Sequence, residues 1–522
     1  MLIINDSELV VTTRRPHLVT ECIPKSRIID TNGDLYRVSV NWGLDEAQTL
    51  AQLRVKKVPS PILRDYKWPG VFPPMAHQKE TASFLTLNKR SFCFNEQGTG
   101  KTASAIWAAD YLMSIGRIKR ALIISPLSIM QSAWQADLFK FAVHRKVGIA
   151  YGDRTKRKAV INSDADFVVI NYDGIEIVAE DIIFAGFDLI IIDEANAYKT
   201  PTTKRWKTLN AILKSHDDMW LWMMTGTPAA QSPTDAYGLA KMCVPDKVPR
   251  FFGAFRDMTM YSVSKFRWLP KPTADRIVFD ALQPAIRFTK EECIDLPEIT
   301  HVFRDAPLTP QQEKYYKILK QQMLMVAAGE EISTVNAATN LNKLLQISGG
   351  AVYSDTGAVI EFDVSNRLRV IQEVIEEASH KVLVFVPFTH TIELLKAHLR
   401  GVGITCEVIN GAVAVNKRTE IFKDFQETDK IKVLIIQPQA AAHGVTLTAA
   451  NVIIWYSPVT SIETYLQANA RIHRKGQKNP MTIVHIKGSP VETRLYQMLQ
   501  NKLDVHEKII DLYKNEINEK NT

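Results

Sequence analysis

The chain has 522 residues, 46% of them hydrophobic and 23% charged, which is typical of a globular protein with two or three domains. Its formal charge of +8 suits a nucleic-acid partner without requiring one. The five cysteines form no C-x-x-C pair, so we expect neither structural zinc nor disulfides. The N-terminus lacks the layout of a signal peptide, and no apolar run reaches the roughly 18 residues of a membrane span. We therefore expect a cytoplasmic protein.

Residues 1–65 differ from the rest of the chain. Their hydrophobic residues alternate with polar ones, and they carry several prolines and the basic residues Arg14, Arg15, Lys25, Arg27, Lys56 and Lys57. Alternation of this kind is typical of strands with one buried face. We therefore expect a small accessory element, and the sequence leaves open whether it grips DNA or is only a pair of surface strands.

From residue 66 onward, short apolar runs alternate with stretches long enough for helices. The runs of the first half are SFCFNEQG (91–98), ALIISPLS (121–128), DFVVINYD (166–173), FDLIIIDEA (187–195) and MWLWMMTGTP (219–228). Those of the second half are KVLVFVPFTH (381–390), CEVING (406–411), KVLIIQPQ (432–439), NVIIWYSP (451–458) and TIVHIKG (482–488). This rhythm is typical of parallel α/β sheets buried on both faces. It predicts two such units, over residues 66–300 and 301–522, with a break near residues 297–310.

The stretch NEQGTGKT (95–102) follows a predicted strand and precedes a predicted helix. It fits the phosphate-loop pattern G-x-x-x-x-G-K-[S/T] except at the first glycine, where Asn95 stands. Glycines allow the backbone to approach phosphates closely, and the N–H groups of the following helix point at the anion. We therefore expect this loop to bind ATP, with Lys101 on the β and γ phosphates and the Thr102 hydroxyl on Mg²⁺; its other members are Gly98, Thr99 and Gly100.

The run FDLIIIDEANAYKT (187–200) is a hydrophobic strand that ends in Asp193 and Glu194. Carboxylates at the C-terminal end of such a strand face the ligand crevice of an open α/β sheet. Asp193 is then suited to hold Mg²⁺, and Glu194 to orient and deprotonate the attacking water. For an isolated pair, capping of the next helix is a sound alternative; a phosphate loop upstream in the same sheet favours the catalytic interpretation.

Two further stretches are TGTP (225–228) and QANARIHRKGQ (467–477). A Gly-x-Pro stretch is often only a turn. In the second stretch, Gln467, Arg471 and Arg474 lie at i, i+4 and i+7 and are expected to share one face of a helix. Taken alone, a short basic helix is more often a solvated surface than a binding site.

The order of NEQGTGKT, DEAN, TGTP and QANARIHRKGQ resembles the Swi/Snf-type ATPases of helicase superfamily two, which are DNA translocases related to chromatin remodellers and annealing helicases. The resemblance extends over residues 70–500 and is greatest to compact phage and bacterial members. Asn196, Thr446, Ala441 and Ala442 depart from the family pattern without removing a catalytic group. Further support comes from MAHQKETASFL (75–85), ALQPAIRFTKEECIDLPE (281–298), INGAVAVNKRTEIFKDF (409–425) and QAAAHGVTLTAANVIIWYSP (439–458).

The resemblance implies two tandem RecA-like lobes with short helical insertions, and a role for each motif residue. Gln78 would read the adenine. Gln467, Arg471 and Arg474 of the second lobe would approach the γ-phosphate bound by the first, the arginines acting as fingers. Coupling between nucleotide and nucleic acid would use Thr225, Thr227 and Gly444. Nucleic acid would contact residues 126–134, 171–173, 386–390 and 443–446.

The leading hypothesis is an ATP-driven translocase on double-stranded DNA, a monomeric motor that remodels or anneals rather than unwinds. Its cofactors would be ATP and Mg²⁺. An RNA helicase is the second hypothesis, although TGTP argues against the DEAD-box type. A third is a nucleotide-gated nucleic-acid-binding scaffold without turnover, against which the intact Lys101, Asp193, Glu194, Arg471 and Arg474 speak.

Overall fold

In the computed structural model the chain divides into two compact units. The first unit comprises Met1–Ala229 and Pro233–Cys293, and the second comprises Ala230–Ser232 and Ile294–Thr522. No helix among the described residues is both long enough and apolar enough to cross a membrane. The described residues are 2–4, 7–216, 218–226, 228–229, 232–264, 267–293, 297–327, 334–353, 359–441, 445–474 and 476–501.

The first unit is built on a seven-stranded sheet in the order β13-β5-β10-β9-β6-β8-β7, with every neighbouring pair parallel. Its central strands are rich in β-branched residues and buried on both faces, as expected for a sheet covered by helices. The predicted parallel sheet is thus confirmed. The strands are β5 (Arg90–Cys93), β6 (Ala121–Ser125), β7 (Val147–Ala150), β8 (Phe167–Asn171), β9 (Leu189–Ile192), β10 (Trp220–Met224) and β13 (Ala285–Ile286).

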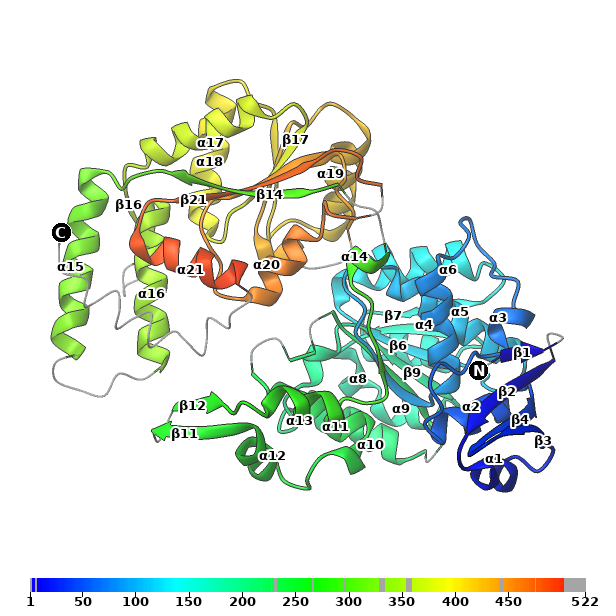
Figure 1. Cartoon of the computed structure of the whole chain (residues 1–522). Helices are drawn as coiled ribbons and strands as arrows, with labels where there is room; N and C mark the ends of the chain where they lie inside the picture. The colour runs from blue at the N-terminus through cyan, green and yellow to red at the C-terminus, as the bar shows by residue number, and fades with distance from the viewer. Residues whose placement is uncertain are drawn as a thin grey trace. The chain divides into compact units, whose positions relative to one another are not determined.

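Helices cover both faces of this sheet (Figure 1). Helix α5 is buried along nearly its whole length, because its alanine-rich sequence packs against both α4 and the sheet. Apart from the helices of the N-terminal element and of the insertion described below, the helices in the described part of the unit are α4 (Ala76–Leu87), α5 (Lys101–Ser114), α6 (Ala136–Phe141), α7 (Arg154–Ile161), α8 (Gly174–Ile177), α9 (Ala179–Phe184), α10 (Lys204–Lys214), α11 (Asp235–Cys243) and α14 (Lys290–Cys293). Short 3₁₀ segments are η1 (Leu127–Ile129), η3 (Ala195–Tyr198) and η4 (Pro245–Lys247), and η2 (Met130–Gln135) is a π-helix.

The N-terminal element is a four-stranded antiparallel sheet in the order β1-β2-β4-β3 with helices against it, and so is more than a pair of surface strands. It shares one hydrophobic core with α4 and α5 of the first unit. Hydrogen bonds also join it to α4, from Ser60 N to Ser83 Oγ (3.0 Å) and from Gln48 Nε2 to the Thr86 carbonyl (2.9 Å). Its elements are β1 (Leu2–Ile4), β2 (Glu8–Thr13), α1 (Pro16–Cys22), β3 (Arg27–Asn32), β4 (Leu35–Asn41), α2 (Leu44–Gln52) and α3 (Ile62–Asp65).

A small insertion precedes the last strand of the first sheet. It combines two helices with an antiparallel hairpin. The guanidinium carbon of Arg256 lies 3.9 Å from the centroid of the Trp268 ring. The indole is thus used for packing within the insertion. The elements are α12 (Phe252–Thr259), β11 (Met260–Ser264), β12 (Arg267–Pro270) and α13 (Ala274–Ala281).

The second unit contains a six-stranded parallel sheet in the order β14-β21-β20-β17-β19-β18. The break expected near residues 297–310 falls instead on an edge strand, β14, so the predicted boundary at residue 300 lies inside a strand. Seven residues of β14 pair in register with β21, which holds this segment in the sheet. The strands are β14 (Ile299–Asp305), β17 (Lys381–Phe385), β18 (Cys406–Ile409), β19 (Val433–Ile436), β20 (Ala450–Trp455) and β21 (Met481–Lys487).

Helices α15 and α16 of the second unit lie side by side and lead into a short hairpin, β15–β16 (Figure 1). Two capping boxes start helices in this unit, with the Gln312 side chain accepting from Thr309 N (3.0 Å) and the Glu492 side chain from Ser489 N (3.2 Å). The remaining elements are α15 (Pro310–Ala327), α16 (Thr334–Gly349), β15 (Ala351–Tyr353), β16 (Val359–Glu361), α17 (Ser365–Glu377), α18 (Thr389–Gly401), α19 (Val415–Glu427), η5 (Pro438–Ala441), α20 (Ile462–Asn469) and α21 (Pro490–Gln500).

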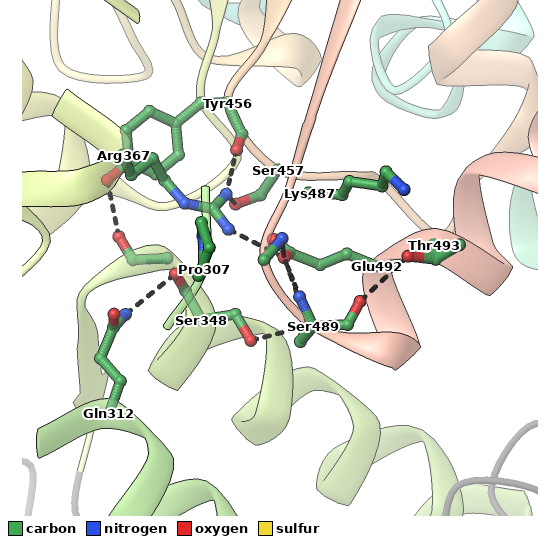
Figure 2. A network of polar contacts seen from close by, with 12 residues as sticks. Pro307, Gln312, Ser348, Arg367, Tyr456, Ser457, Lys487, Ser489, Glu492 and Thr493 are labelled. Carbon is green, nitrogen blue, oxygen red and sulfur yellow. Dashed lines mark hydrogen bonds and ion pairs between the residues drawn. The ribbon is translucent and has the colours of Figure 1, made fainter. Parts of the chain in front are cut away.

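Figure 2 shows a buried ion pair that joins α17, the end of β20 and the start of α21. Arg367 lies 2.8 Å from Glu492, and their side chains are only 3% and 0% exposed. The guanidinium also donates to the Tyr456 carbonyl, while the carboxylate accepts from Gly488 N (2.8 Å). Through the hydroxyl of Ser489, this network continues to α16.

Replacing Arg367 with methionine should lower the free energy of unfolding by about 3–5 kcal/mol, because Glu492 becomes a buried charge without its cation. Differential scanning calorimetry measures the loss. Arg304→Ala is the control, since its ion pair with Glu377 is exposed and should contribute no more than about 1 kcal/mol. Equal losses of unfolding free energy in the two variants would contradict the prediction that burial makes the Arg367–Glu492 pair the more important one.

Candidate functional site: a phosphate loop beside a buried carboxylate pair

The predicted phosphate loop runs from the end of β5 to the start of α5. Gly98 and Gly100 have φ of +88° and +83°, a left-handed backbone that favours glycine, and Gly100 is the N-cap of α5. Asn95, at the position of the family's first glycine, is not among the residues with positive φ. Its side chain instead donates to Thr81 Oγ1 (2.8 Å) and accepts from Phe288 N (3.0 Å), so asparagine fastens the start of the loop to neighbouring segments.

Lys101, the first residue of α5, is 9% exposed, and its Nζ donates to the Asn95 carbonyl (2.8 Å). The ammonium is therefore held over the loop, where it offsets part of the rise that burial causes in the pKa of Asp193. Thr102 follows in the first turn of the helix and is partly exposed. Together with the free N–H groups of the helix start, these side chains suit a phosphate ligand.

Helix α4 lies against the same loop. A Cβ at Gly100 would lie 2.0 Å from Gln78 Nε2, which places the predicted adenine-reading side chain directly against the loop. Gln78 Oε1 accepts from Met75 N (2.9 Å) at the start of its own helix. The neighbouring His77 donates from Nε2 to the Thr99 carbonyl (2.8 Å), a contact that the sequence did not indicate.

Asp193 directly follows β9 and is 8% exposed. Burial raises the pKa of its carboxyl above the ordinary value, and Lys101 and the Trp134 indole offset only part of this rise. One oxygen, Oδ2, accepts from Trp134 Nε1 (2.9 Å), and the other accepts from Glu194 N (3.0 Å). No pattern in the sequence indicated the contact with the tryptophan.

Glu194 has φ of +47°, which is strained for a residue with a side chain, and such strain is concentrated at functional sites. Its Oε1 accepts from Gln97 Nε2 of the phosphate loop (3.3 Å). Tyr172 OH donates to the Asp193 carbonyl (2.6 Å). Glu194 occupies the N-cap of η3 without capping it through its side chain, so helix capping does not explain the acidic pair.

The side chains here fit a magnesium ion. Mg²⁺ prefers oxygen ligands, and it is usually held by one or two carboxylates, water and substrate phosphates. Thr102 and Asp193 supply a hydroxyl and a carboxylate. Because a carboxylate has about four lone-pair sites, the two hydrogen bonds to Asp193 leave capacity for the water shell of a cation.

The TGTP stretch follows β10, next to the loop. Thr225 is fully buried, and its N–H donates to the Cys93 carbonyl (3.1 Å). A Cβ on Gly226 would lie 3.4 Å from the Gln97 side chain. The stretch is thus in contact with the phosphate loop. Two other predicted coupling residues, Thr227 and Gly444, lie outside the described residues.

The expectation that Gln467, Arg471 and Arg474 share one helical face is wrong, because α20 ends at Asn469. Beyond Asn469 the Arg471 carbonyl accepts a hydrogen bond from Leu447 N (3.0 Å), which is a tertiary contact in place of a helical one. Gln467 remains on α20 and donates to Glu463 Oε1 (3.1 Å).

The two arginines differ in exposure. Arg471 is 2% exposed, and Nη1 donates to the Val445 carbonyl (3.5 Å). Arg474 is half-buried, and its guanidinium donates to the Ala470 carbonyl (2.8 Å) and to Thr446 Oγ1 (3.4 Å). Arg474 is therefore the more accessible of the two candidate fingers.

Of the segments predicted to meet nucleic acid, residues 126–134 form η1 and most of η2, and residues 171–173 begin at the end of β8. Residues 386–390 follow β17, where His390 pairs with Glu361 (2.7 Å). In the last segment, residues 443 and 444 lie outside the described part of the chain.

Two family models match the chain: the helicase conserved C-terminal domain over residues 366–476 and the SNF2-related domain over residues 77–348. The second match alone covers more than half of the 522 residues. The chain belongs to the SNF2-related family. This membership confirms the resemblance to Swi/Snf-type ATPases that the motif order indicated.

Individual relatives of this SNF2-related protein are distant. Chromodomain-helicase-DNA-binding protein 1-like of Mus musculus is 24% identical over 444 residues, which cover 80% of this chain and 47% of the mouse protein. The chain thus spans about half the length of that relative. Protein p41 of Acyrthosiphon pisum secondary endosymbiont phage 1 is 26% identical over 445 residues, covering 80% of this chain and 93% of the phage protein. A solved Sulfolobus solfataricus SWI2/SNF2 ATPase core in complex with dsDNA is 21% identical, covers 86% of this chain and 95% of that one, and has a TM-score of 0.40.

Proposed function

We propose that this SNF2-related protein is an ATP-dependent translocase on double-stranded DNA that hydrolyses ATP to ADP and phosphate. The observation that supports this most is the meeting of a phosphate loop and two carboxylates at one edge of the first sheet. The Lys101 ammonium offsets part of the rise that burial causes in the pKa of Asp193, and Glu194 accepts a hydrogen bond from Gln97 of the loop itself. A nucleotide-binding loop in contact with an acidic pair is what phosphoryl transfer to water requires.

On the nucleotide side, the start of α5 and the Lys101 ammonium bind the phosphates. Gln78, which lies against Gly100, contacts the adenine. Thr102 and Asp193 hold Mg²⁺, which neutralises phosphate charge when bound. Phosphoryl transfer depends on such positioning and charge neutralisation more than on covalent chemistry.

Glu194 orients the attacking water and takes its proton. The hydrogen bond from Gln97 to one carboxylate oxygen fixes the direction of the side chain relative to the phosphate loop. Since Gly226 contacts Gln97, the TGTP stretch is suited to relay the state of the nucleotide, with Thr225 and Thr227 as its hydroxyl residues.

In the second unit, Arg471 and Arg474 act on the γ-phosphate and Gln467 assists in nucleotide binding. An arginine fork matches phosphate oxygens better than a lysine does. Since Arg471 is almost fully buried and Arg474 only half-buried, we assign the direct contact to Arg474 and a supporting role to Arg471.

Double-stranded DNA is the proposed track. The chain carries a formal charge of +8, and the name of its mouse relative includes the words helicase and DNA-binding. Contacts would be made mostly to phosphates, so binding should weaken steeply with salt and depend little on sequence. Gly444 would couple these contacts to the nucleotide.

An ATPase assay on single-stranded, duplex and forked DNA and on RNA, at one salt concentration, tests the proposal. Duplex DNA should give the strongest stimulation. Stimulation by RNA with none by DNA would contradict the proposal in favour of an RNA helicase. Nucleotide binding without hydrolysis on any substrate would instead favour a nucleotide-gated scaffold.

A further inference from the structure

The segment between β6 and α6 has an unusual backbone. It begins with the 3₁₀ turn η1 (Leu127–Ile129) and continues directly into the π-helix η2 (Met130–Gln135) before becoming α-helical. π-Helical turns are rare, and they are found frequently at functional sites. A backbone of this kind needs a local reason, which the contacts of its side chains provide.

Trp134, on the π-helix, is fully buried in the core of the first unit. Its indole Nε1 donates to Oδ2 of Asp193 (2.9 Å). An indole N–H can only donate, so the bond favours the ionised carboxylate and fixes the orientation of this oxygen. With Glu194 N on Oδ1, both oxygens of Asp193 are oriented by the protein.

The same segment also has an outward side. Leu127 is 51% exposed and Gln131 is exposed, only a few residues from the buried Trp134. One short segment therefore reaches from the protein surface to the carboxylate proposed to hold Mg²⁺. A shift in the backbone of this segment would change the position of the indole relative to Asp193.

Tyr172 is a second residue that contacts the acidic pair from another part of the chain. It follows β8, and its hydroxyl donates to the Asp193 carbonyl (2.6 Å) and the Glu194 carbonyl (3.3 Å). Its ring packs edge-on against Tyr198 and lies beneath Arg205. The backbone of the acidic pair is thus fixed by Tyr172, whereas its metal-facing carboxylate is fixed by Trp134.

We propose that Trp134 is a positioning residue, whose indole N–H sets the orientation of the Asp193 carboxylate. This inference rests on the proposed function, because it takes Asp193 as a magnesium ligand. Partners that orient a metal ligand commonly change metal affinity by about 10–100-fold when removed.

The test compares Trp134→Phe with Trp222→Phe. Trp222 is a matched control, since it is also fully buried in the first unit, and its indole donates to a backbone carbonyl, that of Asn88 (3.1 Å). Binding of a fluorescent ATP analogue is titrated with Mg²⁺ for each variant. Trp134→Phe should need about 10–100-fold more Mg²⁺ for half-maximal binding, while Trp222→Phe keeps the wild-type requirement. Equal requirements in the two variants would overturn the positioning role.

Trp134→His keeps a ring N–H donor and separates this bond from the packing of the indole. It should need less Mg²⁺ than Trp134→Phe, and equal requirements would overturn the role of the N–H. If Trp134→Phe does not melt cooperatively, Trp134→His is compared with Trp222→His instead. The quantity compared is again the Mg²⁺ concentration needed for half-maximal binding of the ATP analogue.

The Mg²⁺ titration needs neither DNA nor hydrolysis. If the wild-type protein binds nucleotide but shows no stimulated hydrolysis, the proposed function fails while the titration still decides the role of Trp134.

Discussion

Replacing Arg474 with alanine should lower the rate of ATP hydrolysis by about 10³–10⁵-fold, the usual effect of losing an arginine finger. The guanidinium is half-buried and donates to the Ala470 carbonyl and to Thr446 Oγ1, so it lies closer to the surface than that of Arg471. Affinity for DNA should be nearly unchanged, because one cation among many phosphate contacts contributes little to it.

Steady-state hydrolysis and fluorescence anisotropy with duplex DNA measure the two quantities. Arg369→Ala is the control, as it removes the same charge from an exposed position on α17. Arg474→Lys keeps the charge but not the fork, and should remain strongly impaired. Loss of DNA binding with normal turnover would show that Arg474 contacts nucleic acid instead. Arg471→Ala is a poorer probe, because its burial adds a stability effect.

Replacing Glu194 with glutamine should lower turnover by about 10²–10⁴-fold, since an amide cannot accept the proton of the attacking water. ATP should remain bound, because Lys101 and the start of α5 are unchanged. The substitution keeps an oxygen that can accept the hydrogen bond from Gln97, so the geometry of the loop is preserved.

Single-turnover hydrolysis and nucleotide-binding titrations distinguish these effects. Glu176→Gln makes the same chemical change at a carboxylate that pairs with Lys204 (2.9 Å) away from the phosphate loop, and should hydrolyse ATP at the wild-type rate. Equal turnover in Glu194→Gln and the wild type would remove Glu194 from the role of base. Loss of ATP binding in Glu194→Gln would indicate that Glu194 has a structural role.

Local patterns in the sequence were sufficient for much of the fold. The apolar runs that become β6, β8, β9 and β17 are short and rich in β-branched residues, and each is followed by a helical stretch. The phosphate loop is likewise local, because a strand, a turn with Gly98 and Gly100 and the start of a helix are consecutive in the chain. Capping of α15 and α21 depends on residues three positions apart.

Other features depended on partners far along the chain. The break predicted near residues 297–310 falls on the edge strand β14, because its pairing with β21 involves residues far along the chain. The helix predicted through Gln467, Arg471 and Arg474 ends at Asn469, and beyond it Leu447 N donates to the Arg471 carbonyl. Nor did residues 1–65 indicate that their apolar side chains complete the core of α4 and α5.

The sequence by itself determined the family, the two parallel sheets and the identity of the phosphate loop and acidic pair, because each depends on neighbouring residues or on motif order. Only the tertiary structure decided what orients the acidic pair: Trp134 from a π-helix, Tyr172 from the end of β8 and Gln97 from the loop. These bonds join segments distant in sequence. They form only when parallel strands bring their C-terminal ends to one edge of the sheet, and no local pattern carries that information.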